Sequence, residues 1–180
     1  MAISYSQTPT EQTIEDTIAD FLELANGLKC FFENSEHSRK KPYQTVNIDT
    51  NKRRGKPWKV QTFGGSATTQ KKHPVDLLIS VNIFLDLYDS KGKPIRESPK
   101  TYADFILNAI NEPDLKTGLD AIGLKISSSR QVISDITFIE DDKFVKQSVL
   151  ELGFKYVHTA QKVDSDVITQ IDTPTLTVTE

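Results

Sequence analysis

Histidines and a cysteine are the side chains of this sequence most able to do chemistry. The three histidines, His37, His73 and His158, are far apart in the chain, and none belongs to a His-x-His or similar metal-binding motif. Isolated histidines without ligand spacing are more often ordinary polar residues than metal ligands. The single cysteine, Cys30, is followed by two phenylalanines, which favours a buried structural thiol over a nucleophile. These residues predict no metal centre and no thiol active site, and we expect no cofactor.

A run of carboxylates, Glu140-Asp141-Asp142, is the remaining candidate for catalysis, because such oxygens hold Mg²⁺ or Ca²⁺. The run falls between two stretches of alternating polarity, where we predict a hairpin turn, and acidic residues are common in turns. A small metal-dependent enzyme therefore stays open only as a minor alternative. Since no catalytic constellation has a spacing beyond chance, we expect that the protein is not an enzyme.

The charges are unevenly distributed along the chain. The 180 residues carry a formal net charge of −3. Eleven Lys or Arg face three acidic residues between Lys29 and His73, a local balance of +8 that leaves −11 for the remainder. Such separation gives a molecule faces of opposite sign, suited to docking copies head to tail or to contacting a polyanion. The alternative interpretation is that the cations are solvated loop tips.

The candidate contact residues are the cations of one short stretch, Arg53, Arg54, Lys56 and Lys59. We interpret the stretch 51–57 as a basic hairpin arm between two strands. Neighbouring aromatic residues would add a stacking surface for a nucleic acid, although they are equally well explained as sheet packing. The acidic net charge argues against a dedicated nucleic-acid binder. The aromatic residues are Tyr43, Trp58 and Phe63.

Composition predicts a folded, water-soluble chain. Hydrophobic residues make up 37% and charged residues 26%, and a chain of this length buries roughly 70% of its unfolded surface without staples. One cysteine excludes an intramolecular disulfide framework. No apolar run approaches the roughly 20 residues of a membrane-spanning helix, and the first residues do not resemble a signal peptide. We therefore expect an intracellular protein that does not contact membranes.

Helical spacing of apolar residues appears three times. We predict a first helix over Pro9–Asn26, with Thr8 as its cap and a glycine as its stop. A second helix begins at Ser98-Pro99 and ends before Pro113, and Gly123 closes a shorter third piece.

Alternating polarity marks the strands. The strongest pattern runs from Asp76 to Tyr88, where the odd-numbered residues are apolar, so we expect this strand to cross the whole sheet. The fold class expected is α+β: an antiparallel or mixed β-sheet flanked by two main α-helices, with a protruding β-hairpin arm and an extended C-terminal arm. Residues 1–162 would form one domain and residues 163–180 the arm. The other predicted strands are Tyr43–Asp49, Trp58–Phe63, Val132–Glu140 and Phe144–His158.

The order of these segments is informative as a set. After the first helix come Lys41-Pro42-Tyr43-Gln44-Thr45-Val46, Val75–Phe84, Tyr102–Leu107, Gly123–Ser127, Arg130–Ile136 and Val149–Tyr156. This succession, over about Thr8 to Asp172, resembles the neck or tail terminator proteins of tailed bacteriophages. Each motif is the start of a strand or a helix rather than a catalytic signature. The charged stretch Asn51–Lys59 and the Thr-rich segment Val163–Glu180 are elaborations on the simplest form of that pattern.

The resemblance implies a structural virion protein of the phage neck. Such subunits form a ring, typically of six, that terminates the tail tube and joins the tail to the head-side connector. The implied partners are further copies of the chain, a tail tube or sheath protein, the connector or adaptor protein and, non-specifically, DNA passing through the lumen. The implied location is the virion, after assembly in the bacterial cytoplasm. The alternatives are a nucleic-acid-binding module using residues 52–59, and another phage structural role as a head-completion or baseplate protein.

Overall fold

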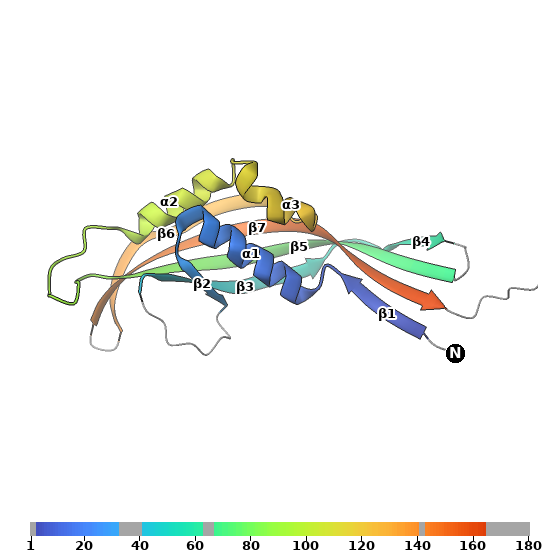
Figure 1. Ribbon diagram of the computed structural model, residues 1–180, viewed down its shortest axis with the longest axis horizontal. Coiled ribbons are helices and arrows are strands. Elements are labelled where there is room, and N and C mark those ends of the chain that lie inside the picture. The colour runs from blue at the N-terminus through green and yellow to red at the C-terminus, as the bar shows by residue number, and fades with distance from the viewer. Residues whose placement is uncertain (1–2, 33–40, 63–66, 141–142, 165–180) are drawn as a thin grey trace, which may run out of the picture.

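The computed structural model describes residues 3–32, 41–62, 67–140 and 143–164. Within these ranges, seven strands form one mixed sheet and the helices lie together on one of its faces (Figure 1). The expected α+β class with a mixed sheet is confirmed. The elements in chain order are β1 (Ile3–Thr8), α1 (Glu11–Asn26), β2 (Lys29–Phe32), β3 (Tyr43–Arg53), β4 (Trp58–Thr62), β5 (Ala67–Asp86), α2 (Pro99–Ala109), the 3₁₀ turn η1 (Asp114–Lys116), α3 (Thr117–Ala121), β6 (Lys125–Glu140) and β7 (Lys143–Asp164).

Two long antiparallel strands, β5 and β7, form the spine of the sheet and pair from Ala67↔Asp164 to Asp86↔Val145. The outer edge of β5 carries β3 and then β4, and the outer edge of β7 carries β6 and then β1. The prediction that the strand containing Asp76–Tyr88 crosses the whole sheet is confirmed. It begins nine residues earlier than its apolar alternation indicates.

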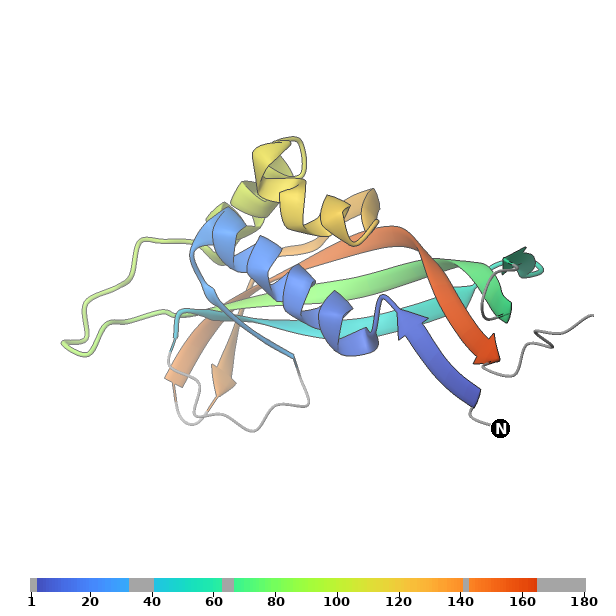
Figure 2. The same ribbon diagram turned by 45° about the vertical axis from the view of Figure 1, so that its right-hand side comes forward.

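The sheet narrows to its two central strands at one point along this spine. β3 ends opposite Val75 and β4 begins opposite Lys72, so His73 and Pro74 lie between them. On β7, the pairing with β6 ends at Lys155 and the pairing with β1 begins at Thr159. Figures 1 and 2 show that the helices cover the sheet on one side of this narrow point, while the part with β1 and β4 extends beyond them.

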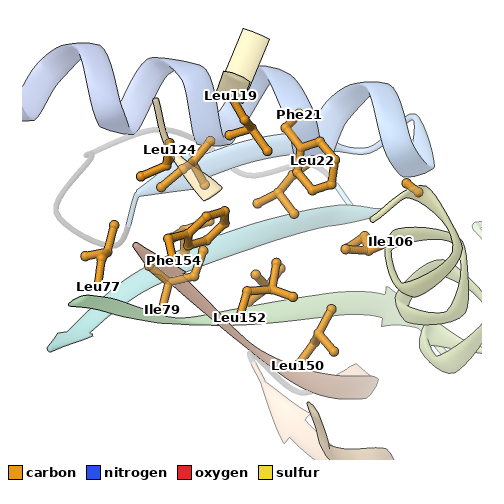
Figure 3. Packing of buried hydrophobic residues seen from close by; sticks show 14 of the residues in the cluster. Phe21, Leu22, Leu77, Ile79, Ile106, Leu119, Leu124, Leu150, Leu152 and Phe154 are labelled. Carbon is orange, nitrogen blue, oxygen red and sulfur yellow. The ribbon is translucent and has the colours of Figure 1, made fainter. Parts of the chain in front are cut away.

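The hydrophobic core lies between the helices and the covered part of the sheet (Figure 3). α1 supplies Ile14, Ile18, Phe21 and Leu22, at the spacing that places them on one helical face. On the strands, alternate residues face the helices, as period-two patterning requires. These buried strand residues are Val75, Leu77, Ile79, Val81, Ile83 and Leu85 of β5 and Leu150, Leu152, Phe154 and Tyr156 of β7.

Some of the helix caps are those predicted from the sequence and others are not. Ser98 caps α2 as predicted, accepting a hydrogen bond at 3.1 Å from the Lys100 amide. The predicted cap Thr8 is wrong, because Thr8 is the last residue of β1 and pairs with Thr159. Thr10 caps α1 instead, and its Oγ1 accepts from the Thr13 amide at 3.1 Å. β1 itself was not expected from the sequence.

The end of β7 also differs from expectation. β7 continues to Asp164, so Val163 and Asp164 belong to the sheet rather than to a separate arm starting at residue 163. Residues 165–180 lie outside the described residues. Phe144, the first residue of the predicted strand Phe144–His158, is half exposed, because the register places it opposite Ile139 at the tip of the β6–β7 pair.

Candidate functional site

The sheet is strongly basic around and beyond the narrow point. Asn51 to Arg53, at the end of β3, lie just before it, opposite Leu77 to Val75. We call residues Asn51–Thr62 and Ala67–His73 the basic extension; they comprise the end of β3, the link to β4, β4 itself and the start of β5. The sequence has no acidic residue from Asn51 to Val75. The seven cations of the extension are Lys52, Arg53, Arg54, Lys56, Lys59, Lys71 and Lys72.

The predicted hairpin arm at residues 51–57 is wrong. β3 and β4 do not pair with each other: both pair with β5, end to end along the same edge. The link between them turns at Gly55, whose φ of 68° favours glycine, and reaches Pro57, which has no amide to donate. The Arg54 amide donates to the Pro74 carbonyl at 2.8 Å. In place of the expected hairpin turn, the short link joins two consecutive strands that pair with the same edge of β5.

The four predicted contact residues are not brought together as one patch. Arg53 lies opposite Val75, on the helix side of the sheet, whereas Arg54 forms an ion pair with Asp76, which belongs to the other side. Lys56 is exposed in the link. Lys59 lies on β4, on the helix side but beyond the helices.

Lysines face each other across β4 and β5. Lys59 is the direct cross-strand partner of Lys71, and both side chains are exposed. Like charges at such positions, with Cβ atoms about 4.5–5.5 Å apart, destabilise a sheet. Within the described ranges, Arg54 is the one cation of the extension that forms an ion pair with a carboxylate. The basic extension therefore holds unrelieved positive charge, which an anionic partner would neutralise.

A polar pocket of about 260 Å³ lies at the base of the extension. It forms where β1, the start of α1, the end of β3 and β7 meet. Arg53 is the one cation of the basic extension among the residues that line this pocket. The lining residues are Gln7, Pro9, Glu11, Ile14, Asn51, Arg53, Val75, Tyr156 and His158.

Two titratable side chains of β7 line the pocket in their neutral forms. Burial lowers the pKa of His158, helped by the positive charge of Arg53 and by His73. His158 is 9% exposed; its Nε2 lies 3.4 Å from Gln7 Oε1, and its buried Nδ1 has no hydrogen-bond partner among the described residues. Burial is also the largest cause that raises the pKa of Tyr156, whose hydroxyl lies 3.5 Å from Asn51 Oδ1.

The sequence gives no indication of this pocket. His73 and His158 are far apart in the chain, whereas the register of β5 and β7 makes them direct cross-strand partners. No local signal predicts this pairing, because 85 residues separate them. The pocket offers a guanidinium, an amide and a phenol, which are hydrogen-bond donors suited to an anionic or carbonyl group. It has no nucleophile paired with a base.

The other chemical candidates have structural roles. Burial raises the pKa of Cys30 to about 12, as expected for a structural thiol. Glu140 of the acidic run accepts a hydrogen bond at 2.6 Å from Lys41, whose ammonium lies 3.5 Å from Asp86. Asp141, Asp142 and Phe63 lie outside the described residues. In the ranges that the structure covers, no three His, Cys, Asp or Glu side chains gather as a metal site.

The aromatic residues considered for stacking on a nucleic acid lie in different parts of the sheet. Tyr43 is buried between Phe31 and Phe84, at ring-centroid distances of 6.1 and 5.2 Å, on the helix-free face of the sheet. Trp58 is 46% exposed and lies opposite Lys72 in the basic extension. Trp58 is therefore the aromatic side chain available beside the cations.

Comparison with known proteins gives no family for this chain. No protein-family model matches it, and no curated protein matches it significantly. None of the helices in the described part of the chain is long and apolar enough to span a membrane.

Proposed function

We propose that this chain is a structural subunit of the neck of a tailed bacteriophage. In this proposal, copies form a ring of six that terminates the tail tube and joins the tail to the head-side connector. The order of sequence segments that resembles tail terminator proteins supports the proposal. The structural observation that carries it is the basic extension, where the sheet continues beyond the helices.

The extension has features of a contact surface. Residues 51–60 are all exposed, including Trp58 at 46% and Val60 at 39%. β4 pairs only with β5 among the described strands, and a ribbon of few strands without a hydrophobic cover is marginally stable in water. A sheet that exposes both faces and an edge in this way is suited to binding another chain.

Ring formation would follow from a head-to-tail contact between copies. A ring requires a heterologous interface, in which one surface binds a different surface of the next copy and the rotation closes. The uneven charge of this chain supplies two such surfaces. The tail tube or sheath protein and the connector would bind the two faces of the ring, and DNA would pass through the lumen without sequence-specific contacts. The virion is the proposed location.

The test is the mass of the protein in solution, measured by light scattering at several concentrations and two salt levels, with electron micrographs of the same samples. The expected result is a particle with a central hole and a mass close to six times the 20.2 kDa of the chain, either alone or after addition of purified tail tubes. A protein that stays monomeric under both conditions contradicts the proposal.

A nucleic-acid-binding module is the second candidate, and the facing lysines Lys59 and Lys71 favour it. Phosphate contacts by these cations would make duplex binding strongly salt-dependent. Fluorescence anisotropy with duplex DNA should then show binding that weakens when Arg53, Arg54, Lys56 and Lys59 are replaced by serine. Undetectable binding at about 0.15 M salt eliminates this candidate.

A further inference from the structure

α1 presents a surface whose charge is opposite to that of the basic extension. From Glu11 to Asn26 the helix contains five acidic residues and no Lys or Arg. Glu23 pairs with Lys29 at 2.9 Å. In the part of the chain that the structure describes, the other four make no ion pair. We call these four the acidic stripe: Glu11, Glu15, Asp16 and Asp20.

The acidic stripe occupies two rows on α1, each with members one helical turn apart: Glu11 with Glu15, and Asp16 with Asp20. Asp16 and Asp20 are exposed on the side of the helix away from the buried apolar residues, whereas Glu15 lies beside those residues and is half-buried. The apolar residues of α1 face the sheet. Glu15 is crowded by its acidic neighbours: burial is the largest cause that raises its pKa, followed by the charges of Glu11 and Asp16. A cationic partner would relieve this repulsion.

The extension of the same chain does not cover the stripe. In Figures 1 and 2, α1 begins beside β1 and runs away from the end of the sheet that carries β4. Only Glu11, at the start of the helix, lies near the extension, where it lines the pocket with Arg53. Asp16 and Asp20 lie further along the helix. Each chain therefore exposes an unpaired anionic surface and an unpaired cationic surface at different places.

We propose that the basic extension of one copy binds the acidic stripe of the next copy. This inference rests on the proposed ring and names the contact that builds it. Lys59 and Lys71 lie on the helix side of the sheet, beyond the helices, and would contact Asp16 and Asp20 of the neighbour. Trp58 and Val60 alternate with Lys59 along β4, so they lie on the opposite face of the sheet and stay outside this contact. The contact is heterologous, as a closed ring requires, and it leaves a free extension and a free stripe at the ends of any incomplete assembly.

We infer from the charges which partner binds the basic extension. The chain as a whole is acidic, with a net charge of −3, although the extension carries seven cations and no acids. The acidic stripe of a second copy of the same chain supplies anions for the extension. Because every copy carries both surfaces, the two are present at equal concentration. A nucleic acid would satisfy the extension but would leave the acidic stripe unpaired.

Charge reversal on each surface tests the contact. The extension variant carries Lys59→Glu and Lys71→Glu, and the helix variant carries Asp16→Lys and Asp20→Lys. Each variant alone should associate roughly tenfold or more weakly than the wild type at low salt, because attraction becomes repulsion. An equal mixture of the two variants should associate again, since each reversed surface then meets a complementary one. A single chain carrying all four substitutions should also recover.

Matched control variants carry the same charge reversals at residues outside the two surfaces. Lys91→Glu with Lys93→Glu, and Glu112→Lys with Asp114→Lys, alter exposed residues outside both surfaces. These controls should associate like the wild type. Circular dichroism and thermal unfolding of every variant show whether the fold is retained. Restoration by mixing two weakly associating variants cannot arise from misfolding.

The outcomes separate this inference from the proposed neck function. A wild-type ring that neither reversal weakens overturns the contact and leaves the neck proposal intact. Recovery in the mixture as open chains, without closed rings, supports the contact and contradicts the ring. A wild type that does not associate at low salt overturns the contact, and duplex-DNA binding lost in the extension variant would then assign that surface to nucleic acid.

Discussion

The covered part of the sheet and the part beyond the narrow point are built around the same two strands, β5 and β7, yet they are stabilised differently. In the covered part, alternate residues of both strands are buried beneath three helices. In the extension no helix lies on the sheet, and the strands are joined mainly by backbone hydrogen bonds. One continuous strand is thus covered by helices on one side of the narrow point and has no helical cover on the other.

The largest expected difference between the two parts is the response to side-chain truncation in β7. Phe154 is fully buried under the helices, so Phe154→Ala should lower the free energy of unfolding by about 3–5 kcal/mol, from lost burial and the cavity left behind. Val157, three residues later, lies opposite Pro74 at the narrow point and is 43% exposed, so it is the matched control outside the helical cover. Val157→Ala should cost less than about 0.5 kcal/mol. Urea unfolding of both variants measures the difference, and equal losses would break the comparison.

A second pair of variants should have opposite effects in the two parts. Lys41 lies between Glu140 and Asp86 on the helix-free face of the covered part, so Lys41→Met removes both ion pairs and leaves the carboxylates facing an apolar side chain. The expected loss of unfolding free energy is about 1–2 kcal/mol, at the lower end for such pairs because both carboxylates are partly exposed.

The same substitution at Lys59 in the extension removes one of two facing cations. Lys59→Met should therefore leave stability unchanged or raise it by a few tenths of a kcal/mol. Urea unfolding at low and high salt checks both variants, since only the Lys59 effect should shrink with salt. A Lys59 variant destabilised as much as the Lys41 variant would show that an unrecognised anion pairs with this lysine.

The smallest expected effect is a pH dependence at the narrow point itself. The pKa of His158 is lowered in the folded state from an ordinary value of 6.5. The unfolded chain therefore binds a proton more readily, and His158 should reduce stability as the pH falls below about 6.5. The loss should level off once the pH passes below the folded pKa. His158→Gln should flatten the stability profile between about pH 7 and about pH 5.

Replacing His73 gives a second test of the pH dependence attributed to His158. His73 is one of the groups that lower the pKa of His158, so His73→Gln should raise the pKa of His158 and reduce the pH dependence of stability. Proton NMR of the His158 ring follows its titration directly. An unchanged His158 titration in the His73 variant contradicts the cross-strand arrangement.

Much of the covered part could be predicted from the sequence because burial imposes a period on the residues. The apolar residues from Leu77 to Leu85 alternate, and those of α1 recur at helical spacing, since each set faces the same core. The α2 cap at Ser98 was predictable for a local reason, namely the proline that follows it. These signals need no knowledge of distant residues.

The extension and the pocket could not be predicted in the same way. Residues Ala67–His73 of β5 are polar or small and Pro74 follows them, so no alternation indicates that the strand continues. Pairing with β7 holds these residues in the sheet, and that partner lies some 90 residues away in the chain. The predicted turn at residues 51–57 failed for the same reason: its glycine and proline are typical of hairpins, whereas here they mark a break between two strands that share the edge of β5.

The narrow point at His73 and Pro74 has a mechanical consequence. The resistance of a sheet to bending and twisting increases with the number of strands side by side, and here two strands, with the Arg54 to Pro74 hydrogen bond beside them, connect the two wider parts. The narrow point is thus the most compliant position along the spine, and deformation concentrates there. Bending at this position would move β4 and the start of β5 relative to the core, while the Pro9–Thr10 link from β1 to α1 also joins the two parts. In a closed assembly, such compliance would let every copy adjust its reach to the neighbour.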